Sequence, residues 1–94
     1  MSGARKGYLW ELEVQHRLES HRWMVFRCAG SKPLDLIAFR PGRLPLWIEC
    51  RTSRSPSASE RDFWEHLARI TGAHFLVAIQ RRRSRTRRKR GVKA

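Results

Sequence analysis

Apolar side chains follow a helical period in one part of this chain and gather in short continuous runs in others. Over residues 7–20 they recur every three to four residues, at Trp10, Val14 and Leu18, which places them on one stripe of a helix. Glu11 falls at the edge of the same stripe. The pattern therefore predicts a first helix that packs through this stripe and carries one acidic residue at its inward margin.

Four short runs rich in aliphatic and aromatic residues predict strands. They are Trp23–Cys28, Leu34–Phe39, Leu46–Arg51 and Ala73–Gln80. Only a few residues around Pro41 and Gly42 separate the second run from the third, so we expect these two strands to form an antiparallel hairpin. The fourth run is nearly all apolar, which predicts a strand buried on both faces.

A second helix is predicted between the third and fourth strands. Ser57, followed three residues later by Glu60, has the spacing of a capping box, and Gly72 is a C-terminal stop. The order α-β-β-β-α-β then predicts an α/β domain with a mixed sheet flanked by helices.

The apolar residues of this second helix predict its packing. Phe63, Leu67 and Ile70 fall on one face, and we assign Phe63, Trp64 and Leu67 to the core. Part of the helix is also a candidate dimer surface, because a chain of 94 residues with four Trp would struggle to bury them all as a monomer.

Basic residues outnumber acidic ones by 21 to 8, and they are unevenly distributed. Residues 81–94 hold nine Lys and Arg and no acidic residue, whereas residues 1–80 hold twelve basic and eight acidic residues. This predicts a mildly basic domain over 1–80 and a disordered Arg-rich tail over 81–94. The expected partner is a polyanion, most simply nucleic acid, with an acidic membrane surface as the weaker alternative.

Several protein classes do not fit the sequence. No apolar run approaches the roughly 20 residues of a membrane span, and we expect no signal peptide. Cys28 and Cys50 make neither a disulfide framework nor a zinc site. We therefore expect a cytoplasmic, nucleoid-associated protein of a prokaryote or virus, with no membrane and no small-molecule cofactor.

Three acidic residues stand where the predicted elements converge. Asp35 begins the second strand, and Glu49 lies near the end of the third, on the same face as Arg51. Antiparallel pairing brings Asp35 close to Glu49 and Arg51, and Glu11 on the first helix is within reach of the same point. Each has an ordinary alternative: Glu11 extends to solvent, Asp35 caps a turn, and Glu49 and Arg51 form an ion pair.

Carboxylates gathered at one point repel one another, and a divalent cation relieves that repulsion. Hard oxygen ligands without His or Cys suit Mg²⁺, with Mn²⁺ as a substitute. Such an ion lowers the pKa of a bound water and stabilises charge on a phosphodiester during in-line displacement. Together with a basic surface, this favours a metal-dependent nuclease.

The same residues resemble a known family. Asp35, then Glu49-Cys50-Arg51 after thirteen residues, is similar to the core motif of the PD-(D/E)xK nuclease superfamily. Arg5-Lys6-Gly7, Glu11, the segment 27–32 (Arg-Cys-Ala-Gly-Ser-Lys) and Asp35-Leu36-Ile37-Ala38 resemble the archaeal-type Holliday junction resolvases. The resemblance runs from about residue 5 to 80 and implies a restriction-endonuclease-like fold.

The resemblance also implies an activity and a set of site residues. It implies a Mg²⁺-dependent homodimer that binds four-way DNA junctions and resolves them by paired symmetric nicks. Glu11, Asp35 and Glu49 would hold the metal, with Ser31 and Arg51 beside them as catalytic residues. DNA contacts would come from Arg5, Lys6, Arg27 and Lys32, and the tail adds Arg81, Arg82 and Arg83.

The sequence departs from the family pattern at Arg51, which stands where the motif has Lys. Lys with a lowered pKa can act as a base, whereas Arg stays protonated. Three alternatives therefore stay open: a non-catalytic nucleic-acid-binding protein on this fold, a related nuclease acting on duplexes, flaps or ends, and a ribosomal-type basic protein. Arg22 before Trp23 is a second departure, because the family usually has Gly there.

Overall fold

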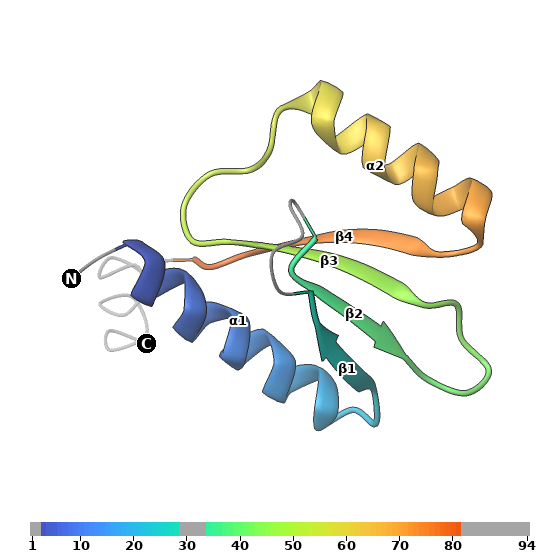
Figure 1. Ribbon diagram of the computed structural model, residues 1–94, viewed down its shortest axis with the longest axis horizontal. Coiled ribbons are helices and arrows are strands. Elements are labelled where there is room, and N and C mark those ends of the chain that lie inside the picture. Colours follow the sequence, from blue (N-terminus) through green and yellow to red (C-terminus); the bar gives the residue numbers. More distant parts are fainter. Residues whose placement is uncertain (1–2, 29–33, 82–94) are drawn as a thin grey trace, which may run out of the picture.

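The residues that the structure describes, 3–28 and 34–81 of a computed structural model, form two helices and four strands (Figure 1). They follow in the order α1 (Gly3–Glu19), β1 (Met24–Arg27), β2 (Leu36–Phe39), β3 (Leu46–Arg51), α2 (Ala58–Thr71) and β4 (His74–Ile79). The predicted α-β-β-β-α-β order is confirmed. The largest difference in bounds is at α1, which begins at Gly3 rather than Gly7.

The four strands form one mixed sheet in the order β1-β2-β3-β4. β1 pairs with β2 and β2 with β3, both antiparallel, whereas β3 and β4 are parallel. The sheet lies between the two helices (Figure 1). The expected hairpin is therefore confirmed, and the parallel pair is reached through the α2 crossover, as parallel pairing requires.

The apolar stripe of α1 packs on one face of the sheet as predicted. Trp10 and Val14 are buried against Leu36, Ala38 and Ile48, and Leu18 packs at the margin of this cluster. The indole Nε1 of Trp10 also donates a hydrogen bond to the carbonyl of Ala78 at 2.9 Å, which joins the first helix to the last strand. Burial of these side chains fixes α1 over the sheet.

The ends of α2 are capped as its sequence predicts. The Ser57 hydroxyl accepts a hydrogen bond from the Glu60 amide at 3.2 Å, and the Glu60 carboxylate accepts one from the Ser57 amide at 3.2 Å. Gly72 ends the helix with φ 88°, a left-handed conformation that favours glycine.

The predicted core of α2 is partly wrong. Phe63 is 59% exposed and Ile70 64% exposed, whereas Ala68 is the buried residue of the helix. Trp64 is half-buried and packs with Trp47 of β3. The helix contacts mainly β4, so the sheet is too narrow at this place to cover a wider apolar stripe, and Phe63 and Ile70 remain on the surface.

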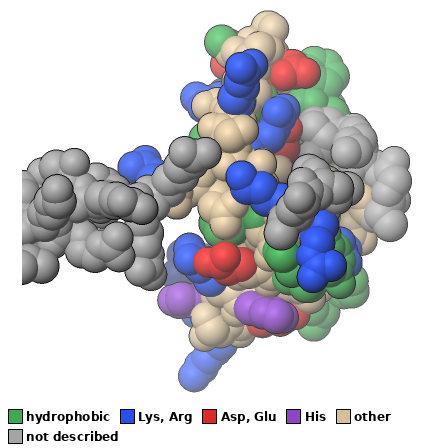
Figure 2. All heavy atoms as spheres, turned by 90° about the vertical axis from the view of Figure 1, so that its left-hand side faces the viewer, with side chains coloured by type: hydrophobic (Ala, Val, Ile, Leu, Met, Phe, Trp, Pro, Cys, Tyr) green, Lys and Arg blue, Asp and Glu red, His purple; other side chains and the backbone are tan. Residues whose placement is uncertain are grey.

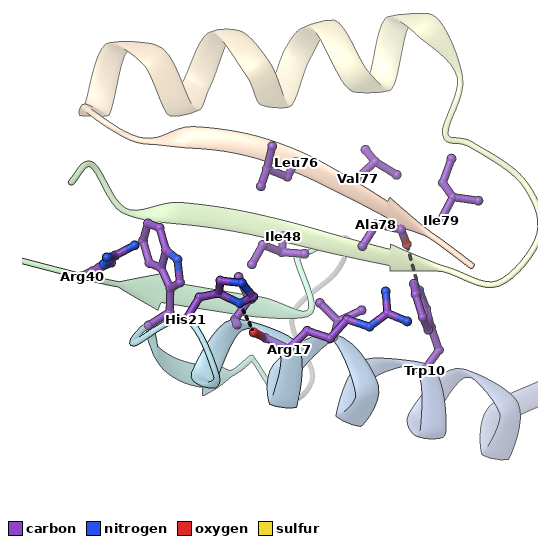
Figure 3. A pocket seen from close by; sticks show the side chains of 12 residues that line it. Trp10, Arg17, His21, Arg40, Ile48, Leu76, Val77, Ala78 and Ile79 are labelled. Carbon is purple, nitrogen blue, oxygen red and sulfur yellow. Dashed lines mark hydrogen bonds between the residues drawn. The ribbon is translucent and has the colours of Figure 1, made fainter. Parts of the chain in front are cut away.

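The prediction that the fourth strand is buried on both faces is also wrong. β4 lies at the edge of the sheet, Leu76 is 45% exposed, and His74 is exposed. On the side of α1, an open cavity of about 520 Å³ separates the helix from this edge (Figure 3). α1 lies over β1, β2 and β3, so part of the neighbouring face stays uncovered.

The turn between α1 and β1 contains a strained residue. Arg22 has φ 71°, in the left-handed region where residues other than glycine are disfavoured. The position at which the family usually has Gly is therefore one at which the backbone favours Gly. In this chain the turn is held by hydrogen bonds from the Arg22 and Trp23 amides to the carbonyls of Glu19 and Leu18.

Neither of the two helices in the described segments has the length and apolar character that a membrane crossing requires. The predicted tail begins with Arg81, which is exposed, and its other residues, 82–94, lie outside the described part of the chain. The division into a domain over 1–80 and a tail over 81–94 stays a prediction.

Candidate active site

Asp35 and Glu49 are brought together by the pairing of β2 with β3. The register ends at the pair Leu36 and Ile48, so the residue before β2 and the residue after Ile48 occupy adjoining positions. The Asp35 amide donates a hydrogen bond to the Ile48 carbonyl at 2.9 Å, which holds the start of β2 against β3. The predicted convergence of these two carboxylates is therefore a property of the sheet.

The side chain of Asp35 is held by the backbone of β3. Its Oδ2 accepts a hydrogen bond from the Cys50 amide at 2.7 Å, while its carbonyl accepts one from the Cys28 amide at 2.9 Å. Backbone donors on both neighbouring strands thus fix this residue. It does not simply cap a turn, because its partners are distant in the sequence.

Glu49 is the one charged residue of the described segments that is buried, at 3% exposure. Its Oε2 accepts a hydrogen bond from Arg51 Nε at 2.6 Å, and Arg51 remains about one-third exposed. A buried carboxylate needs a partner charge, and the next residue but one on the same strand face supplies it. The ion pair considered from the sequence is present, in a buried position that an ordinary surface pair would not occupy.

Glu11 reaches the same end of the sheet from α1. Its Oε1 accepts a hydrogen bond from Arg27 Nη2 at 3.0 Å, and the Arg27 guanidinium lies 4.7 Å from the centre of the Tyr8 ring. The hydrogen bond to Glu11 is the main cause of a raised pKa at Arg27. Glu11 is therefore held by a side chain of β1 rather than by the strand backbone.

The Cys50 thiol is buried close enough to all three carboxylates to feel their charge. Burial raises the pKa of Cys50 to about 12, and the negative charges of Asp35, Glu11 and Glu49 contribute to the increase. The thiol is thus neutral at ordinary pH. The sequence did not predict this role for Cys50.

The carboxylates do not form a ready metal cage. Within residues 3–28 and 34–81, no three His, Cys, Asp or Glu side chains are grouped closely enough to hold a metal ion. Cys50 packs on the α1 face of β3, and the alternation of a strand puts Glu49 on the other face. Glu11 and Glu49 therefore approach from opposite faces, so the metal site stays a prediction.

The predicted DNA contacts are only partly within the described residues. Arg5 and Lys6 are exposed in the first turns of α1, and Arg81 is exposed after β4. Lys and Arg side chains are spread over the face of the molecule shown in Figure 2, with acidic side chains among them. Ser31, Lys32, Arg82 and Arg83 lie outside the described residues.

Two contacts near the candidate site were not predicted from the sequence. Tyr8 stands three residues before Glu11, a spacing that puts both on one side of a helix, and this signal could have indicated a shared contact. The backbone amide of Cys50 carries no sequence signal at all.

The apolar cavity near β4 has no acidic residue in its lining, so it is separate from the carboxylates (Figure 3).

Comparison with known proteins agrees with this geometry. No family model matches the chain. The chain is 49% identical over 49 residues to the crossover junction endodeoxyribonuclease Hjc of Methanocaldococcus jannaschii, a match that covers 52% of this chain and 36% of that relative. The chain thus matches little more than a third of the length of this curated relative.

A solved structure extends the similarity to most of the fold. Hjc of Archaeoglobus fulgidus, described as a Holliday junction resolvase from an archaeal hyperthermophile, superposes with a TM-score of 0.66 at 29% identity. The match covers 84% of this chain and 67% of that protein. The resemblance to archaeal-type Holliday junction resolvases and the predicted fold class are confirmed.

Proposed function

We propose that this chain is a metal-dependent endonuclease that resolves four-way DNA junctions by paired symmetric nicks. One observation carries the proposal: the register of β2 and β3 holds Asp35 beside the Glu49 and Arg51 pair. Asp35 and Glu49 match the superfamily motif at its spacing, with Arg51 in the place of its Lys. The similarity to two proteins named Hjc supports the choice of a branched DNA substrate.

The donor set suits Mg²⁺ or Mn²⁺ in its chemistry. Asp35 and Glu49, which the pairing of β2 with β3 places at adjoining positions, would hold the ion with oxygen ligands, and Glu11 stays the predicted third ligand. The Cys50 thiol is neutral because its pKa is raised to about 12, so it does not compete as a ligand. When bound, the ion would lower the pKa of a coordinated water and offset charge on the scissile phosphate.

Arg51 acts on geometry and charge rather than as a base. A guanidinium stays protonated at physiological pH, so it cannot accept the proton of the attacking water. It fixes the Glu49 carboxylate through a 2.6 Å hydrogen bond and keeps enough exposed surface to contact a phosphate oxygen. We therefore assign proton acceptance to solvent or hydroxide at the site, with Arg51 stabilising negative charge.

A homodimer suits this substrate, because two equivalent strands at a junction require two related sites. The exposed Phe63 and Ile70 of α2 form an apolar surface that a second copy would cover. Exposed Arg5, Lys6 and Arg81 would contact phosphates and so position the DNA without reading its bases. Mass measurement by light scattering at high salt tests the dimer.

The decisive experiment compares a labelled four-way junction with a linear duplex of matching sequence in Mg²⁺. The proposal expects paired nicks in the junction and little cutting of the duplex. Equal cutting of both substrates would identify a nuclease of broader selectivity. Tight binding without cutting in both Mg²⁺ and Mn²⁺ would instead establish a non-catalytic DNA-binding protein.

Substitution of Arg51 by Lys tests whether the chain is a nuclease or a non-catalytic DNA-binding protein. Because Lys is the motif residue, Arg51→Lys should keep or raise the rate of junction cleavage, measured under single turnover. Arg51→Met, which removes the charge, is the matched control and should lower the rate. A complete loss with Lys would show that the site requires the fork of a guanidinium.

A further inference from the structure

The edge strand β4 has no strand on its outer side among the described residues. The sheet ends at β4, so one row of its backbone amides and carbonyls takes no part in strand pairing. Leu76 of this strand is 45% exposed, and His74 is also exposed. An edge of this kind can take up another extended segment through main-chain hydrogen bonds.

The open cavity of about 520 Å³ lies beside this edge, between β4 and α1 (Figure 3). Its volume falls within the roughly 300–1,000 Å³ that is typical of ligand-binding sites. Its lining is largely aliphatic and includes Val14, Leu18, Ile48, Leu76 and Ala78. Strand alternation puts Leu76 and Ala78 on the face of the sheet that α1 covers in part. Apolar side chains of a segment added to β4 would therefore enter this cavity.

The charged or titratable side chains that line the cavity are all basic, and they are Arg17, His21 and Arg40. The Arg17 guanidinium lies 5.7 Å from the centre of the Trp10 ring. That of Arg40 lies 5.9 Å from the centre of the Trp23 ring. Arg17 also bonds Glu13 at 2.6 Å, but it stays 67% exposed, and Glu13 does not line the cavity. The rings hold two positive charges beside an apolar cavity, which favours an occupant with both apolar and acidic side chains.

Three other occupants fit these features less well. Residues 82–94 are mostly Lys and Arg, with Val92 and Ala94 as their aliphatic side chains, so this segment would bring like charge to the cavity. A second copy would bring the same basic lining and a net charge of +13. Nucleic acid has the opposite charge, but an aliphatic lining would leave the polar edges of its bases without hydrogen-bond partners.

We propose that the β4 edge and its cavity form a docking site for an acidic segment of another protein, which adds to the sheet as a fifth strand. Apolar side chains on one face of that segment enter the cavity, and acidic side chains on the same face meet the Arg17 and Arg40 guanidiniums. Main-chain hydrogen bonds to β4 supply affinity, and the cavity supplies selectivity. The cavity lining includes no residue of the candidate active site, so docking leaves that site open.

Fluorescence anisotropy with a labelled synthetic peptide tests the docking site on the full chain. The probe is Glu-Thr-Leu-Thr-Ile-Thr-Glu with blocked ends, which places Leu, Ile and both Glu side chains on one face of a strand. Binding is measured at about 0.3 M salt, which screens contacts with other exposed Lys and Arg side chains. This peptide should bind, and the same peptide with Lys in place of Glu should bind about 10-fold more weakly or not at all.

Matched variants locate the peptide on the protein. Leu76→Glu puts a carboxylate into the cavity and should weaken peptide binding about 10-fold. Leu44→Glu is its control and should bind like wild type, because Leu44 is 50% exposed and does not line the cavity. Arg40→Glu should weaken binding about 5-fold, whereas Arg61→Glu, at an exposed position of α2, should leave it unchanged.

Nuclear magnetic resonance of the wild-type chain gives a second measurement, which does not depend on how well Leu76→Glu folds. Peptide addition should shift the amide signals of β4 and slow their hydrogen exchange. No peptide binding by wild type, equal binding by Leu76→Glu and Leu44→Glu, or shifts confined to other elements would each overturn the docking site. Oligothymidylate of about ten nucleotides is the rival probe. If it displaces the peptide and its own binding depends on Leu76, the cavity is a nucleic-acid site and the proposal is wrong.

Discussion

The two halves of the candidate site are built from different kinds of contact. On β2 and β3, Asp35 and Glu49 are placed by strand register, a backbone hydrogen bond and an ion pair of which one member is buried. On α1 and β1, Glu11 is placed by an exposed guanidinium. Register cannot change without unpairing the sheet, whereas an exposed ion pair contributes little and exchanges readily. The strand half is therefore preformed and the helix half is adjustable.

The largest effect on cleavage should come from neutralising Asp35 or Glu49, the two carboxylates of the preformed strand half. Asp35→Asn and Glu49→Gln should each lower junction cleavage about 100-fold or more, because each removes negative charge where the metal and the scissile phosphate would meet. Gel-shift assays should show junction binding retained or strengthened. If either variant loses DNA binding along with cleavage, its carboxylate is a structural residue and the comparison fails.

Neutralising Glu11, the carboxylate of the adjustable helix half, should lower the cleavage rate less. Glu11→Gln keeps a hydrogen-bond acceptor for Arg27 and an oxygen that can face the metal, so cleavage should fall by about 10-fold. Single-turnover rates on the junction, measured beside those of Glu49→Gln, make the comparison. Equal losses in the two variants would mean that both halves are preformed.

Burial of the Cys50 thiol, reinforced by the nearby carboxylates, predicts a dependence of stability on pH. Because the pKa of Cys50 is raised to about 12 in the folded protein, from the ordinary value of 9.0, the folded state retains a proton that the unfolded state releases. The contribution of the thiol to stability is complete below pH 9 and is lost as the pH rises from 9 toward 12.

Urea unfolding at several pH values checks this dependence. Between pH 9 and 12, wild type should lose up to about 1.4 kcal/mol per pH unit more than Cys50→Ala, since other groups titrate equally in both proteins. Cys28→Ala is the comparison variant, because burial and the Asp35 charge also raise the pKa of Cys28, but without the large shift of Cys50. Parallel curves for wild type and Cys50→Ala would mean that the pKa of this thiol is not raised in the folded protein.

The smallest effect should come from the turn that leads into the adjustable half. Arg22→Gly relieves a left-handed backbone conformation with φ 71° and should raise the free energy of unfolding by about 1 kcal/mol. Thermal unfolding measures the change. Cleavage should be unaffected, and a change in its rate would show that the turn also sets the position of Arg27.

The sequence predicted those features that depend on local spacing. The capping box at Ser57, the strand over Leu46–Arg51 and the adjoining positions of Asp35 and Glu49 follow from periodicity and register. Burial of Phe63 and of the last strand was predicted wrongly, because it depends on where the helices lie on a narrow sheet. Strand propensity and residue spacing carry no information about that placement.

The contacts of the candidate site were also predicted only in part. Glu49 and Arg51 share a strand face, so their contact could be inferred. The partner of Glu11 could not, because Arg27 lies sixteen residues away on another element and its choice among nearby acids is decided by packing. Roles that the resemblance implies for Ser31 and Lys32 lie outside the described residues and stay predictions.

The hydrogen bond from Trp10 to Ala78 has a consequence for how the chain folds. It joins residues 68 positions apart, and it can form only after the α2 crossover has brought β4 beside β3. Contacts of such long range slow folding, because chain entropy is lost before they form. We expect the β2–β3 hairpin, and with it the preformed carboxylates, to assemble early, and the docking of α1 that delivers Glu11 to complete folding.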